Sequence, residues 1–154
     1  MSETVKYNNP PGLAKPLGAY SHVARAKASK LVFIAGQLAV NEAGELVGKG
    51  DFGAQMRQVF DNLGRALLSE GLGFTNVTKF TAFLVHSQDL EGFMAVRKEL
   101  YAKIYPGGQY PPNTLLMVDR LVGGTVSDRG RGHRGGLLNL AGQCAKWHSK
   151  DLYS

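Results

Sequence analysis

The sequence predicts one α+β domain in which two helices cover one face of a mixed β-sheet. Three observations lead to this prediction. The chain has only 154 residues, 44% of them are hydrophobic, and segments with helical spacing of apolar residues alternate with β-branched segments. A chain of this length is typical of a single globular domain. The predicted order is β-β-(β)-α-β-α-β, in which the bracketed strand is the weakest.

The N-terminal part is predicted to form an extended arm followed by strands. Residues 1–17 form the arm, because the prolines within it block regular structure. Residues 19–26 and 31–39 are predicted strands, and the second is the stronger because it is almost continuously apolar. A turn at residues 43–44 then allows residues 45–47 to return as a short strand.

Residues 51–70 are predicted to form the first helix. Asp51 is a suitable N-cap, and Gly71 is a suitable stop because glycine tolerates the left-handed backbone that often ends a helix. Apolar residues at steps of three and four form one stripe, which can pack on a sheet. This stripe consists of Phe52, Met56, Val59, Phe60, Leu63 and Leu67.

The next three elements are predicted to form one crossover unit. Residues 77–85 and 114–122 are rich in β-branched and apolar residues, which favours strands, and residues 89–105 between them have helical spacing. Such a unit predicts two parallel strands joined by a right-handed connection. The stripe of its helix consists of Phe93, Val96 or Arg97, Leu100 and Ile104, with Asp89 as N-cap and Pro106 as the end.

Both helices are expected to cover the same sheet face, which leaves the other face without a cover. That face is expected to carry Phe33, Phe83 or neighbouring apolar residues. A chain of this size has no second layer to cover them. Self-association through the sheet face is therefore the simplest expectation.

The composition excludes several classes of protein. The single cysteine, Cys144, excludes an internal disulfide framework, and the four histidines lack metal-ligand spacing, so no metal is expected. No apolar run approaches the ~18 residues that span a bilayer, and the N-terminus lacks the apolar segment of a signal peptide. We expect a soluble cytoplasmic protein with no membrane partner.

The net charge of +6 is divided evenly along the chain. Residues 1–122 hold 13 basic and 10 acidic residues, and residues 123–154 hold five and two, so each part contributes +3. The body is therefore only mildly basic, and it has no basic stripe interleaved with aromatic residues. Nucleic acid is thus not expected as a partner.

Short motifs in residues 16–122 have the order and spacing of a known family. They are Pro16-Leu17-Gly18-Ala19-Tyr20-Ser21, Phe33-Ile34-Ala35-Gly36-Gln37, Gln55 through Leu63, Val77 through Leu84, and Asp89-Leu90. In these motifs the chain resembles the Rid family, also called YjgF-like or L-PSP proteins. The resemblance implies a chorismate-mutase-like α+β fold. It also implies a homotrimer that binds small molecules in clefts between subunits.

The resemblance implies an activity and also a departure from it. Members of the best-known branch hydrolyse reactive enamines and imines without a cofactor, and an arginine in a Pro-x-Arg motif holds the substrate carboxylate. Here Asn113 stands at the arginine position, after Pro111 and Pro112. Losing such a charge-assisted contact costs about 1.5–3 kcal/mol. A neutral or differently charged ligand therefore suits Asn113 better than an anionic imine does.

The resemblance also implies the residues of the cleft, and each has a purely structural alternative. Tyr20 can close the cleft or only pack at an interface, and Gly36 can present its N–H to a ligand or only form a strand bulge. Asn113 can bind a ligand or only form a turn. The expected ligand-binding residues are Tyr20, Ala35, Gly36, Gln37, Asn113 and Thr114, and no catalytic residue is assigned.

The tail, residues 123–154, differs in character from residues 1–122, which we divide into the arm and a body at 18–122. Residues 123–136 contain six glycines and no strand pattern, whereas the family ends in a strand of alternating apolar and acidic residues. Codons for residues 123–135 exist that encode such a strand when the frame moves by one nucleotide. Our hypothesis is a frameshift near residue 122, and the alternative is a genuine extension. Made as written, the chain is expected to lack an edge or inner strand.

Three functions stay open at this stage, including whether the chain is an enzyme. The first is a small-metabolite protein of the Rid family with hydrolytic deamination as its inherited activity. The second is a non-catalytic protein that binds a ligand or a partner. The third is an endoribonuclease or translation inhibitor, an activity attached to some relatives. The sequence offers that activity neither an acid/base pair nor a basic groove.

Overall fold

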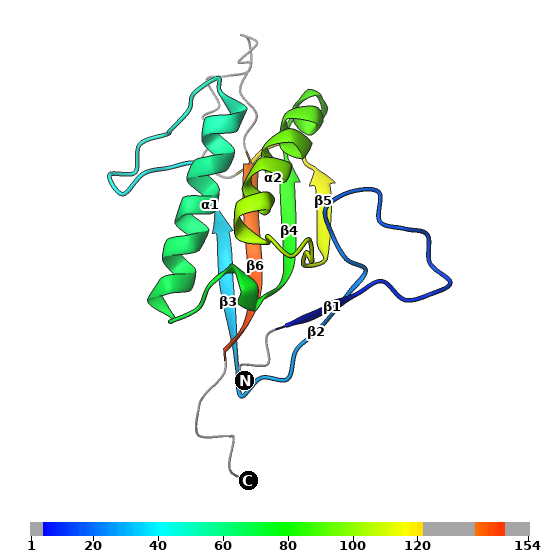
Figure 1. Ribbon diagram of the computed structural model, residues 1–154. Coiled ribbons are helices and arrows are strands. Elements are labelled where there is room, and N and C mark those ends of the chain that lie inside the picture. The colour runs from blue at the N-terminus through cyan, green and yellow to red at the C-terminus, as the bar shows by residue number, and fades with distance from the viewer. Residues whose placement is uncertain (1–4, 122–137, 147–154) are drawn as a thin grey trace.

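Two helices pack on one face of a four-stranded sheet in the computed structural model, which describes residues 5–121 and the backbone of residues 138–146 (Figure 1). The strands are β3 (Lys30–Gln37), β4 (Val77–Leu84), β5 (Asn113–Met117) and β6 (Leu138–Lys146). Their order in the sheet is β3-β6-β4-β5. β6 is antiparallel to both neighbours, whereas β4 and β5 are parallel. The predicted α+β fold is confirmed.

Helix α1 spans Phe52–Ser69 and has the predicted ends. An Asp51 carboxylate oxygen accepts a hydrogen bond from the backbone N–H of Ala54 at 2.9 Å, which satisfies one of the unpaired donors of the first turn. Gly71 follows the helix with φ of +67°, a conformation that glycine adopts without the steric cost of a side chain.

Helix α2 spans Leu90–Ile104 and connects the parallel strands β4 and β5, as predicted. Its start differs from the prediction. Asp89 precedes the helix, but its side chain makes no capping bond, because residues 87–89 form a 3₁₀ turn that leaves Asp89 in a helical conformation. The helix ends two residues before Pro106, as the proline predicts.

The core lies between the helices and the sheet. Its α1 residues follow the predicted stripe, and on α2 both Val96 and Arg97 are buried, together with Tyr101, which the predicted stripe omits. Buried members of the core include Met56, Val59, Phe60, Leu63, Leu67, Phe80, Ala82, Leu84, Phe93, Val96 and Tyr101.

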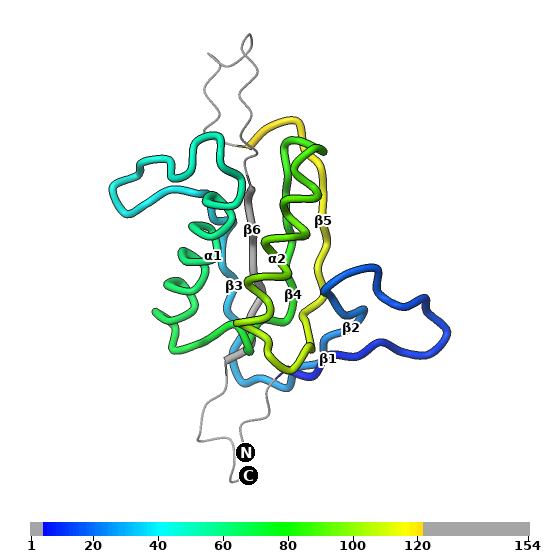
Figure 2. Tube along the Cα trace, turned by 45° about the horizontal axis from the view of Figure 1, so that its top comes forward, coloured from blue at the N-terminus to red at the C-terminus, as the bar shows by residue number. Residues whose placement is uncertain are grey.

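The N-terminal region departs from the prediction in three places. The arm contains a strand, β1 (Lys6–Asn8), and the strand predicted at residues 19–26 shortens to β2 (Val23–Arg25). These two form a separate antiparallel pair, and within the described part of the chain neither pairs with another strand. The segment between them extends beside the β5 edge of the sheet (Figure 2). Residues 45–47 make only a single bridge, Val40 to Leu46.

Strand β6 belongs to the tail, residues 123–154, which we did not expect to supply a strand of the sheet. It pairs with β3 on one side and β4 on the other, so it occupies an inner position of the sheet. The expectation that the chain as written lacks an edge or inner strand is therefore wrong, because a later stretch of the tail supplies the backbone partners. Residues 123–136 lie outside the described part. The boundary at residue 122 and the frameshift stay predictions.

The sheet face opposite the helices carries exposed apolar side chains. On β3, Leu31 is 61% exposed and Phe33 is 70% exposed. Neither helix covers them, because both helices lie on the other face (Figure 1). Among the helices of the described residues, none is long and apolar enough to cross a membrane.

Candidate functional site

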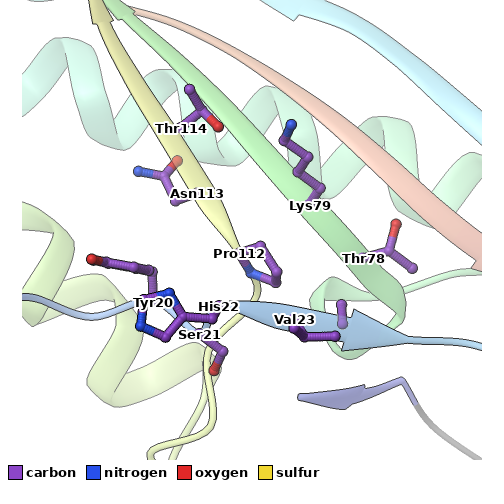
Figure 3. Close-up of a pocket in the computed structure, with 10 residues that line it drawn as sticks. Tyr20, Ser21, His22, Val23, Thr78, Lys79, Pro112, Asn113 and Thr114 are labelled. Atoms are coloured by element: carbon purple, nitrogen blue, oxygen red, sulfur yellow. The ribbon is translucent and has the colours of Figure 1, made fainter. Parts of the chain in front are cut away.

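A cleft of about 590 Å³ lies where the segment before β2 meets the first residues of β4 and β5 (Figure 3). It contains three of the six predicted ligand-binding residues, Tyr20, Asn113 and Thr114. The remaining lining residues are Ser21, His22, Val23, Ala24, Thr78, Lys79 and Pro112.

The start of β5 places Asn113 and Thr114 on opposite faces of the sheet. The Phe80 N–H donates to the carbonyl oxygen of Pro112 at 2.9 Å, which fixes the two strands at this point. Asn113 is in register with Phe80, whose side chain is buried under the helices. Residues in register project from the same face and neighbours along a strand alternate. Asn113 therefore lies on the helix side, and Thr114 lies on the open side.

The segment before β2 forms the wall that carries Tyr20 and His22. The N–H of His22 donates to the side-chain oxygen of Asn9 at 2.9 Å, and its ring Nε2 lies 2.8 Å from the carbonyl oxygen of Ala14. The Tyr20 and His22 rings meet edge to face with their centres 5.8 Å apart. The arm thus holds the histidine, and the histidine supports the tyrosine.

Three polar groups of the cleft make no hydrogen bond or ion pair with any residue from 5 to 121. They are the Tyr20 hydroxyl, the Asn113 carboxamide and the Lys79 ammonium group. In Figure 3 the Tyr20 phenol and the Asn113 amide point to one side of β5, and Lys79 rises from β4 on the other. These groups can bind a polar ligand without breaking an internal contact.

A buried arginine lies next to this wall. Arg97 of α2 is 4% exposed, and its guanidinium carbon lies 5.0 Å from the centre of the Phe93 ring. Its Nη2 donates to the sulfur of Met94 at 3.0 Å, and its Nε has no hydrogen-bond partner in the described chain. Burial lowers the pKa of Arg97 from its usual value. The guanidinium still stays charged at neutral pH.

The other three predicted residues, Ala35, Gly36 and Gln37, do not line the cleft. They belong to β3, and β6 and β4 separate that strand from β5. At ~4.8 Å between strands, three steps place them about 14 Å away. The pairing of β3 with β6 shifts register between Ile34 and Gln37, as a bulge at Gly36 predicts. Within one chain, the predicted site is therefore divided into two halves.

Sequence reasoning misses Lys79, His22 and Arg97 as parts of this region. Lys79 is a charged residue within an otherwise β-branched and aromatic strand, which is a weak signal. Arg97 gives a stronger one, because it occupies a position on the buried stripe of α2. His22 has no local signal, since only the folded arm brings Ala14 and Tyr20 next to it.

Comparison with known proteins identifies the family. The family model described as Endoribonuclease L-PSP matches residues 12–126. The chain belongs to the L-PSP family, also called the Rid family. The predicted resemblance over residues 16–122 lies within the matched range and is confirmed.

Relatives of this Rid-family chain carry different names. A RutC family protein from Pyrococcus horikoshii is 37% identical over 122 residues, which are 79% of this chain and 88% of the relative. A 2-iminobutanoate/2-iminopropanoate deaminase from Rattus norvegicus is 29% identical over 109 residues, 71% and 74% of the two chains. A crystal structure of a Rid protein from Yersinia pestis has a TM-score of 0.74 and 24% identity, and the match covers 93% of this chain and 99% of that one. That likeness shows the fold.

Proposed function

We propose that this Rid-family protein binds a small metabolite in the Tyr20–Asn113 cleft and hydrolyses a reactive enamine or imine there. One observation carries the proposal: residues 93 positions apart in the sequence, Tyr20 and Asn113, meet in one cleft, and their side chains make no hydrogen bond with any residue from 5 to 121. The rat relative named a 2-iminobutanoate/2-iminopropanoate deaminase supports the choice of reaction.

The reaction needs little from the protein beyond binding and orientation. An imine that has taken up a proton carries a strongly electrophilic carbon, which water attacks directly. A proton of the bound water then passes to the nitrogen through solvent, the carbon–nitrogen bond breaks, and ammonia leaves with the electron pair. The remaining hydroxyl gives its proton to the ammonia, which leaves the carbonyl of the keto acid and an ammonium ion. The Tyr20 hydroxyl and the Asn113 amide supply hydrogen bonds that orient the substrate for this attack. We assign no residue as the general acid or base.

We further propose that the active form is a homotrimer. The exposed face with Leu31 and Phe33 needs a cover, and residues 35–37 lie on the same strand. If β3 of one copy packs beside the Tyr20–Asn113 cleft of the next, the two halves of the predicted site meet across the boundary between subunits. Self-association thus accounts for both the apolar face and the divided site.

The test is a coupled assay in which 2-iminopropanoate is generated enzymatically and its loss is followed in the presence of the purified chain. Tyr20→Phe removes one hydrogen bond and is expected to lower kcat/KM by roughly 2- to 12-fold. Tyr110→Phe is the matched control, because Tyr110 stacks on Tyr101 away from the cleft. Equal rates with and without the unchanged chain refute the proposed reaction.

A non-catalytic binding protein is the second candidate, and Asn113 at the arginine position favours it. Saturable binding of a small molecule without turnover supports this alternative. Activity that appears only in Asn113→Arg indicates a cleft that can catalyse the reaction but lacks the arginine that holds the substrate carboxylate. The family model that matches this chain is described as an endoribonuclease, which makes RNA cleavage a third candidate. RNA cleavage that survives purification and disappears in a Tyr20 variant would favour that function.

A further inference from the structure

The cleft has a buried positive charge beside it that the described chain does not neutralise. Arg97 makes no ion pair with any described residue, its Nε is unpartnered, and its one hydrogen bond is to a weak acceptor, the sulfur of Met94. Charged side chains are rarely this buried unless they are paired. An arginine in this position therefore needs an anion from elsewhere.

Arg97 does not line the cleft itself, but it lies next to the segment that carries Tyr20. Its Nη2 is so close to Gly18 that a side-chain carbon at that glycine would lie 2.9 Å from it. Gly18 begins the turn in which the N–H of Tyr20 donates to the Gly18 carbonyl at 2.9 Å. Tyr20 is also near enough to interact electrostatically with Arg97. The guanidinium is thus next to Tyr20, one of the residues that line the cleft.

Asn113 lies on the same side of the sheet as Arg97. It is in register with Phe80, and the Phe80 ring packs 6.4 Å from the ring of Tyr101 on α2. Arg97 precedes Tyr101 by one helical turn, so the two residues occupy the same face of the helix. Tyr20, Asn113 and Arg97 therefore converge at the helix side of β5.

We propose that Arg97 is the anion-binding residue of the Tyr20–Asn113 cleft and holds the carboxylate of its small-molecule ligand. This inference rests on the proposed function only in that a ligand occupies the cleft. The planar guanidinium can donate two parallel hydrogen bonds to a carboxylate. Tyr20 and Asn113 then add neutral hydrogen bonds. In the Pro-x-Arg motif an arginine at the position of Asn113 supplies the positive charge, whereas here Arg97 of α2 supplies it. With that charge in place, Asn113 no longer favours a neutral ligand.

Lys79 is the competing cation, and the structure favours Arg97. Lys79 lines the cleft, but it is exposed and lies on the open side of the sheet with Thr114. Water and salt screen an exposed ammonium group, whereas they screen a buried guanidinium much less. Arg97 is also on the side to which Tyr20 and Asn113 point. A Lys79 variant therefore tests the competing cation of the same cleft.

The test compares binding of pyruvate with binding of pyruvamide, its neutral analogue, by NMR titration or calorimetry at constant ionic strength. The unchanged chain is expected to prefer pyruvate. Arg97→Met keeps much of the side-chain volume and removes the charge, so it should weaken pyruvate binding by roughly 10- to 100-fold and leave pyruvamide binding unchanged. Arg65→Met is the control, since Arg65 is exposed and paired with Asp61. Lys79→Met tests the competing cation, and a greater loss of pyruvate binding in Lys79→Met than in Arg97→Met overturns the proposal.

Thermal unfolding separates this role from a structural one. Removing an unpaired buried charge should leave the Tm of Arg97→Met equal to or above that of the unchanged chain. Arg97→Lys keeps the charge but loses the planar fork, so it should retain a weakened preference for pyruvate. In the unchanged chain, pyruvate should raise the Tm more than pyruvamide does. Equal shifts by the two probes, or full pyruvate binding by Arg97→Met, overturn the proposal.

The same variants distinguish this inference from the proposed reaction. Arg97-dependent pyruvate binding without turnover of 2-iminopropanoate supports the anion site and refutes hydrolysis. Turnover by the unchanged chain with the same KM in Arg97→Met supports hydrolysis and refutes the anion site. Turnover with a KM raised at least tenfold in Arg97→Met, and not in Lys79→Met, supports both.

Discussion

Replacing Phe33 with aspartate should prevent self-association while leaving each subunit folded. Phe33 is 70% exposed in the single chain. Its neighbours Val32 and Ile34 pack against the core, so Phe33 lies on the opposite face of β3. For an aromatic side chain of ~200 Å², this leaves about 140 Å² to bury in an assembly. At ~25 cal/mol per Å², that burial stabilises the assembly by about 3.5 kcal/mol for each subunit. Aspartate loses this contribution and adds a charge that burial disfavours.

The measurement is the molar mass in solution by light scattering, over a range of chain concentrations. The unchanged chain should have the mass of a trimer, and Phe33→Asp should shift toward the monomer. Leu68→Asp is a matched control, because Leu68 is 74% exposed but lies on α1, on the other side of the sheet. Circular dichroism checks that both variants fold.

Two results would refute the reasoning about the open face. One is a monomeric unchanged chain at every concentration, which means that the face is stable in water or meets a different partner. The other is a Phe33→Asp protein that stays trimeric, which means that the subunits associate elsewhere. If the site is completed between subunits, Phe33→Asp should also lose activity in the coupled assay, and Leu68→Asp should not.

Three further predictions concern stability. Leu63→Ala removes a side chain that is 1% exposed, and it should lower the free energy of unfolding by about 2–5 kcal/mol in urea titrations. Asp51→Ala removes the α1 cap and should cost about 0.5–2 kcal/mol by the same measurement, with no change in the urea dependence. The hydrogen bond from Arg57, at 2.7 Å, lowers the pKa of Glu99. The pair therefore stabilises the fold at pH values above the pKa that Glu99 has in the unfolded chain, and this effect is lost as the pH falls through the lower pKa that Glu99 has in the folded chain. Glu99→Gln should therefore lower the Tm slightly at pH 7 and hardly at all at pH 2, and an equal decrease at both would contradict it.

Local signals were sufficient for the elements that depend on near neighbours. The stripe from Phe52 to Leu67 identified α1, and Asp51 and Gly71 identified its ends, because caps and stripes are formed within a few residues. The parallel pairing of β4 and β5 was predictable because a connection as long as a helix joins strands that run in the same direction. The prediction that Asp89 caps α2 was wrong because a 3₁₀ turn, which has no clear sequence signal, precedes the helix.

The residues of the candidate cleft were only half predictable. Tyr20, Asn113 and Thr114 were found from motifs and do meet in one cleft, whereas residues 35–37 lie on a distant strand of the same chain. Lys79 could not be predicted as part of the cleft. Side chains on its strand alternate between the core face and the open face of the sheet, and the sequence alone does not say which residues of the neighbouring strand lie beside Lys79 on the open face.

The sequence by itself determined the helices, the parallel strand pair, the family and the uncharged residue at position 113. Each of these depends on spacing along the chain or on the identity of single residues. Tertiary structure alone decided that the tail supplies the inner strand β6 and that Arg97 lies next to the segment that carries Tyr20. Backbone pairing and the burial of a charge depend on segments that are far apart in the sequence, and only the folded chain brings them together.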